Sequence, residues 1–177
     1  MKLFNFGALS VLIITMLGAC AASGPAVSDS SSVESIFPSW YAMNGFSSDS
    51  VSYLGFATAI AADSTVAVER AEKQARINLE KNIALLTEEI RTDLVKSGSN
   101  NADNTDFIII LRTAHSGVEA AASSNQTIVR NTEGYYRGFA SVEITRAELR
   151  NVLEKGFTGH PRYWGEFSSA QGFAVHF

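Results

Sequence analysis

One helical pattern runs from Asp63 or Ser64 to Lys96, and it constrains the fold more than any other feature of the chain. The segment contains no glycine or proline. Because an α-helix rises about 1.5 Å per residue, the roughly 33 residues would form a helix about 50 Å long. A domain of about 125 residues has a radius of gyration near 14 Å, so such a helix must extend beyond a small core, bend or break. Its apolar residues recur at the spacing of one helical face: Ala67, Ala71, Ala75, Leu79, Ile83, Leu86, Ile90 and Leu94.

A strand is predicted before this helix, in the stretch 51–59. Alternation places Tyr53, Gly55 and Ala57 on one face. Neither face of the strand is purely polar, which favours a covered strand. The small side chains at Gly55 and Ala57 would let a helix approach closely.

The rest of the domain follows from turn residues and spacing. Residues 97–104 are rich in Gly, Asn and Asp and break the long helix. In residues 105–124, Phe107 to Leu111 could be a buried strand, but the apolar spacing over the whole segment predicts a second helix. Residues 127–145 predict a hairpin that turns at Glu133-Gly134. A short helix is predicted from Arg146 to Lys155, with Gly156 ending it.

The resulting order is strand, helix, helix, strand, strand, helix. It predicts an α+β domain over residues 36–156, with a small antiparallel sheet of about three strands covered by the long helix and two shorter helices.

The N-terminus predicts export and lipidation. Residues 1–19 combine Lys2, a short apolar run and small residues before the expected cleavage site, which is typical of a signal peptide. The apolar run is too short to span a membrane. Leu17-Gly18-Ala19-Cys20 resembles the bacterial lipobox, in which the signal is cleaved between Ala19 and Cys20 and the cysteine receives lipid. The alternative is an ordinary secretory signal followed by a free thiol at Cys20, the one cysteine in the chain. A free thiol would be exposed to oxidation outside the cytoplasm.

Residues 20–35 follow as the lipidated cysteine and a small, polar tether. Ala21 stands where inner-membrane lipoproteins of Gram-negative bacteria carry Asp. The resemblance therefore implies a protein anchored by lipid in the cell outer membrane, with the periplasmic side favoured over the surface.

Composition argues against several functions. The formal net charge is −4 and there is no basic cluster, so nucleic acid is a poor partner. The histidines His115, His160 and His176 show no metal-ligand spacing, and we expect no metal or other cofactor. Ser116 follows His115, but neighbouring helical residues point about 100° apart, so they do not form a nucleophile and base. We expect no enzymatic activity.

Two aromatic segments are candidate partner contacts. Trp40 and Tyr41 either contact a partner such as peptidoglycan or close the end of the core where the tether enters. The tail, residues 157–177, either folds back on its own sheet, adding a strand through 172–177, or docks on a neighbouring copy to make a homo-oligomer. The candidate contact residues of the tail are Tyr163, Trp164, Phe167, Phe173 and Phe177.

Three motifs behind the lipobox, "PSWY", "YLGFATA" and "AEKQARINLEKNI", carry a family resemblance. The chain resembles the small bacterial lipoproteins typified by the twenty-kilodalton lipoprotein antigen of gastric bacteria, a family that includes the flagellar lipoprotein FlgP. Tyr53 departs from the family's pattern, which has a second glycine there, and the tail after Gly156 matches nothing in it. The matching residues are Pro38, Trp40, Tyr41, Gly55, Ala57, Ala71, Ala75, Arg76, Leu79 and Ile83.

The resemblance implies a dodecin-like or related α+β fold, no enzymatic activity and, for the FlgP relatives, assembly into rings or discs around the flagellar motor. Three functions remain open at this point. The first is a structural subunit of an envelope assembly, such as a flagellar disc. The others are a monomeric binding module or activator of peptidoglycan enzymes, and a surface antigen or adhesin.

Overall fold

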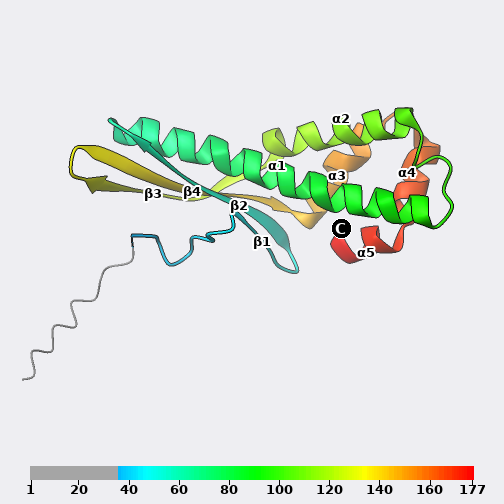
Figure 1. The fold of residues 1–177 in the computed structure, drawn as a ribbon, viewed down its shortest axis with the longest axis horizontal. Helices are drawn as coiled ribbons and strands as arrows, with labels where there is room; N and C mark the ends of the chain where they lie inside the picture. Colours follow the sequence, from blue (N-terminus) through cyan, green and yellow to red (C-terminus); the bar gives the residue numbers. More distant parts are fainter. Residues whose placement is uncertain (1–35) are drawn as a thin grey trace, which may run out of the picture. The chain divides into compact units, whose positions relative to one another are not determined.

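The computed structural model describes residues 36–177 (Figure 1). The predicted signal peptide, the lipidation site at Cys20 and the tether lie outside the described residues. The α+β prediction is confirmed: one antiparallel sheet, in the order β1-β2-β4-β3, packs against helices. The strands are β1 (Phe46–Ser48), β2 (Ser52–Ala61), β3 (Ser123–Thr132) and β4 (Tyr135–Thr145). The helices of the described residues are α1 (Ser64–Lys96), α2 (Thr105–Ala121), α3 (Arg146–Gly156), α4 (Pro161–Ser168) and α5 (Gln171–His176).

The long helix α1 is continuous over its 33 residues. Asp63 caps it, with a carboxylate oxygen accepting from the backbone N–H of Val66 at 3.0 Å. The sheet packs on the N-terminal part of α1, and the C-terminal part lies beside α2, α4 and α5 (Figure 1). The helix is therefore longer than the sheet that it covers, and other helices cover the remainder.

Small residues bring α1 close to the sheet, as the sequence predicts. Ala67, Ala71 and Ala75 are fully buried on the face of α1 that meets β2 and β4. A Cβ atom on Gly55 would lie 2.3 Å from the carbonyl oxygen of Ala75, and one on Gly138 would lie 2.4 Å from that of Ala67. The two backbones are too close for any side chain at these glycines.

The C-terminal half of α1 carries larger apolar side chains because it packs against helices, which lie farther from α1 than the sheet does. Ile83 and Ile90 are buried there. A Cβ atom on Gly172 of α5 would lie 3.0 Å from the side chain of Ile90. The tail therefore completes the core around α1.

Three sequence predictions need correction, and one open alternative is decided. A fourth strand, the three-residue β1, extends the sheet beyond β2. The alternative is decided by residues 107–111, which are helical, so the predicted second helix is confirmed. The sequence predicts that Gly156 follows the helix, but it is the last residue of α3, and it packs against Ala114 of α2. The tail forms α4 and α5, so the suggested strand through 172–177 is wrong.

Candidate functional site

The first aromatic segment covers the face of the sheet opposite α1, here called the outer face. Phe56 of β2 and Phe139 of β4 point to this face because each alternates with a glycine that faces α1. The Tyr41 ring lies 5.6 Å from that of Phe139, and the Trp40 ring lies 6.5 Å from that of Phe56. Phe37 also packs on Phe139, at 5.7 Å. Trp40 and Tyr41 thus close one side of the core, and both remain partly exposed.

The aromatic residues of the tail gather at the other end of α1, and the two aromatic segments do not meet. Phe157, Phe167 and Phe173 are buried together with Phe107 of α2. Phe167 and Phe173 are therefore wrong as exposed partner contacts, since the chain's own core takes up their surface. Tyr163, Trp164 and Phe177 are half-buried at the rim of this cluster.

Arg146, the first residue of α3, ties the end of the tail to the sheet. Its guanidinium donates to the carbonyl oxygen of Asp49 at 2.7 and 3.0 Å, and to those of Val175 and His176 at 3.3 and 2.5 Å. Tyr53 donates its hydroxyl to the same His176 carbonyl. The last turn of the tail is held by charged and neutral donors together.

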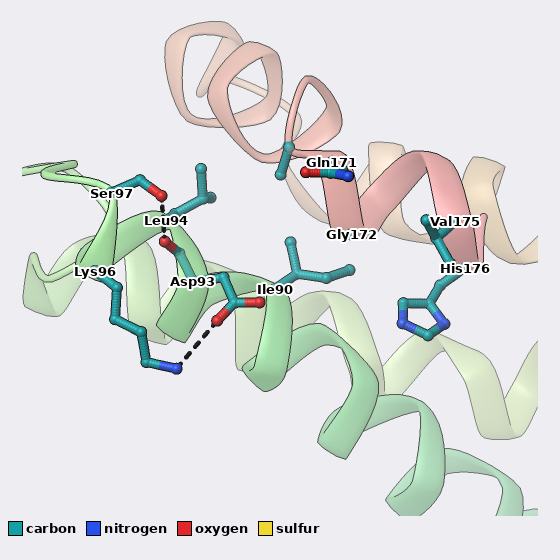
Figure 2. Close-up of a pocket in the computed structure, with 10 residues that line it drawn as sticks. Ile90, Asp93, Leu94, Lys96, Ser97, Gln171, Gly172, Val175 and His176 are labelled. Atoms are coloured by element: carbon teal, nitrogen blue, oxygen red, sulfur yellow. Dashed lines mark hydrogen bonds and ion pairs between the residues drawn. The ribbon is translucent and has the colours of Figure 1, made fainter.

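A surface depression of about 650 Å³ lies between the end of α1 and α5 (Figure 2). Ile90 and Leu94 line one side, and Gly172 and Val175 line the other. The two charged residues at its edge, Asp93 and Lys96, form an ion pair at 3.1 Å. Because these two charges neutralise each other, neither is available as an unpaired charge to bind a charged ligand.

The histidines lie apart, and His115 is structural. It is buried between α1 and α2, with Nε2 lying 2.5 Å from the hydroxyl oxygen of Thr87. Burial lowers the pKa of His115 from 6.5 to about 4, although the nearby carboxylate of Glu88 acts in the opposite direction. Ser116 faces away and donates to the carbonyl oxygen of Thr113 at 2.7 Å. Within residues 36–177, no three His, Cys, Asp or Glu side chains come together as a metal site requires.

The surface that sequence reasoning missed is the edge of the sheet at β3. β3 pairs with β4 along its length, and in the part of the chain that the structure describes no strand pairs with its other side. Nine of its ten side chains are exposed. Ile128 and Val129, at the middle of the strand, are 39 % and 38 % exposed. The sequence indicated the hairpin, but only the order of the strands shows that β3 is at an edge.

The geometry defines a helix-backed antiparallel sheet whose longer edge strand, β3, has no strand on its outer side among residues 36–177. Comparison with protein-family models, with curated proteins and with solved structures finds no match. The resemblance to the lipoprotein family therefore stays a prediction. No helix among residues 36–177 has the length and apolar character needed to cross a bilayer.

Proposed function

We propose that the protein is a lipid-anchored structural subunit of the bacterial cell envelope, without catalytic activity, that is held in the outer membrane through Cys20. The observation that carries the proposal is the sequence Leu17-Gly18-Ala19-Cys20 directly after a short apolar run. A thioether-linked diacylglycerol and an N-terminal acyl chain give three chains, and each buried CH₂ contributes about 0.8 kcal/mol, so such an anchor is effectively permanent.

The domain would lie close to the membrane that holds it. About 15 residues separate Cys20 from Ile36, and a small, polar chain of this length spans about 20 Å on average. This distance is short for reaching a remote target and suits a role next to the membrane. It favours an assembly of copies, alone or with other envelope proteins, over a module that searches the periplasm.

A ring or disc of the flagellar motor is the narrower form of the proposal. It rests on the resemblance of residues 36–150 to the lipoprotein family that includes FlgP. In support, β3 is an edge strand that pairs only with β4 among residues 36–177, so its outer side could contact further subunits.

The anchoring is tested by metabolic labelling with an alkyne fatty acid. We expect the full chain to be labelled and to fractionate with the outer membrane, whereas Cys20→Ser remains an uncleaved, unlabelled precursor. Ser23→Ala is the matched control and should behave as the unsubstituted chain does. Equal labelling of Cys20→Ser and the unsubstituted chain would refute lipid attachment at this residue.

The assembly is tested on the same membranes. We expect chemical cross-linking in intact cells to give multimers that contain this chain. If the lipidated protein remains monomeric in its own membrane, the structural-subunit proposal fails and a monomeric binding module or surface antigen takes its place.

A further inference from the structure

We propose that β3 pairs antiparallel with β3 of a second copy of this chain, so that two four-stranded sheets join into one sheet of eight strands. This inference rests on the proposed assembly and names the surface that makes it. The occupant is a second copy because an antiparallel strand edge is self-complementary: the same residues supply donors and acceptors on both sides of a two-fold axis.

The first observation is the contrast between the two edges of the sheet. At the β2 side, β1 covers part of β2, and beyond it the carbonyl oxygen of Gly45 accepts from Phe56 N–H at 2.9 Å. Asn78 of α1 donates to the Phe56 carbonyl at 2.8 Å. At the β3 side, a ten-residue strand runs without any such cover from the described chain. The edge at β1 is thus only three residues long, whereas the outer side of the ten-residue β3 has no strand partner among residues 36–177.

The second observation is the composition of β3, "SSNQTIVRNT". Edge strands that must stay unpaired carry Lys, Pro or inward-pointing charges, and they are short. β3 has no proline, no lysine and no acidic residue, and Arg130 is its single charge. A bulge near Ser124 disturbs its start, but the pairing from Gln126 to Thr132 is regular. This segment has none of the features that prevent edge pairing.

The third observation is where the exposed apolar residues and Arg130 lie along β3, because these positions favour one pairing register. Pairing centred on Ile128 places Ile128 opposite its own copy, with Thr127 opposite Val129 and Gln126 opposite Arg130. The two Ile128 side chains then meet at the axis, and Arg130 does not face another Arg130. Like charges directly opposite would destabilise a strand pair. The register therefore brings the two Ile128 side chains together and separates the two Arg130 cations.

The same register suits attachment to one membrane. A two-fold axis at Ile128, perpendicular to the sheet, keeps α1 of both copies on one face of the joined sheet. Phe37, where the described chain first packs, then lies on the opposite face in both copies. The described chain therefore begins on the same face of the joined sheet in both copies, as two anchors in one bilayer require.

Edge pairing alone joins little surface compared with the roughly 1,600 Å² of a standard interface. We therefore expect a weak dimer for the unanchored protein and a strong one in the membrane. Two-dimensional confinement raises the effective concentration of the partner without adding any contact.

The test is disulfide cross-linking of the full chain in its own membrane. A lipidated Cys20 cannot form a disulfide, so an introduced cysteine is the one free thiol. We expect Ile128→Cys to give at least ten times more oxidised dimer than Ile109→Cys, a control on α2 with an exposed side chain. Two co-expressed tagged chains, one with Thr127→Cys and one with Val129→Cys, should cross-link to each other more than either does to itself.

A second variant tests the interface without a thiol. Ile128→Lys places two ammonium groups opposite each other and should abolish the dimer, while the melting temperature of the monomer is unchanged because the side chain is exposed. Ile109→Lys should retain the dimer.

The outcomes separate this inference from the proposed function. Three results would each overturn β3 self-pairing and leave the structural subunit standing: multimers that persist in Ile128→Lys, equal oxidation of the Ile128→Cys and Ile109→Cys variants, or a disulfide from the Ile128→Cys variant to a different protein in place of its own copy. A lipidated protein that is monomeric in the membrane would overturn both.

Discussion

The guanidinium of Arg146 lies 4.9 Å from the ring centre of Tyr53, and both side chains donate a hydrogen bond to the carbonyl of His176. Tyr53 belongs to β2 and Arg146 begins α3, so the pair joins the sheet to the last turn of the tail. The contact is possible because Thr145, the last residue of β4, pairs with Ser52 and brings the start of α3 beside β2.

Replacing Arg146 should loosen the tail. Arg146→Leu removes the donors to Asp49, Val175 and His176, and hydrogen bonds from charged groups contribute about 1.5–3 kcal/mol. We expect a loss of about 2 kcal/mol in the free energy of unfolding and faster proteolysis within α5. Arg150→Leu is the control on the same helix. Its guanidinium contacts only the Phe173 ring in the described structure, at 5.6 Å, and should cost less than about 1 kcal/mol. Equal losses would show that Arg146 does not hold the tail.

Gly55→Ala should overpack the contact between β2 and α1. The new Cβ atom would lie 2.3 Å from the carbonyl oxygen of Ala75, and the backbone must move to accommodate it. We expect a loss of about 1–3 kcal/mol, measured by urea denaturation. Gly165→Ala has open space around its Cβ position in α4 and should be neutral or slightly stabilising. An unchanged midpoint for Gly55→Ala would mean that this contact is looser than the structure describes.

Truncation after Gly156 should unfold the domain. Removal of the tail deletes the buried rings of Phe157, Phe167 and Phe173 and uncovers Phe107 and Ile90. Each large buried side chain contributes about 1.5–3 kcal/mol, which is comparable with total stabilities of about 5–15 kcal/mol. Circular dichroism and binding of an apolar dye would report the loss. A truncated chain that keeps a cooperative melt would show that the tail is an appendage, as the docking alternative had it.

Acid should destabilise the protein through His115. The pKa of His115 is about 4 when folded and 6.5 when exposed, so between these values the unfolded chain binds a proton that the folded chain does not. Stability therefore falls as the pH is lowered from 6.5 to 4, by about 3 kcal/mol for a full shift of this size. Thr87, Glu88 and Arg112 surround the ring, and their effects are common to the wild type and a His115→Gln variant. The difference in melting temperature between the two should change across this window, and a constant difference would contradict the lowered pKa.

Elements with local signals could be predicted from their residues without knowledge of the fold. The helix from Ser64 to Lys96 has a capping Asp63, no breaker and a continuous apolar face, so its boundaries do not depend on what packs against it. The hairpin turn needs a residue with positive φ, and Gly134 provides it at φ 84°. The close approach of α1 to β2 was also predictable, because Gly55 and the alanines that include Ala75 recur at the spacing of one strand face and one helix face.

The conformation of the tail, the strand β1 and the edge position of β3 depend on long-range packing. α4 and α5 have eight and six residues, too few for an isolated helix to be stable, and they form because Phe167 and Phe173 find cover on the helical core. β1 has three residues and exists only through its pairing with β2. β3 lies at an edge because β4 pairs between it and β2, and this order is set by how long-range strands pair, which no local pattern of residues contains.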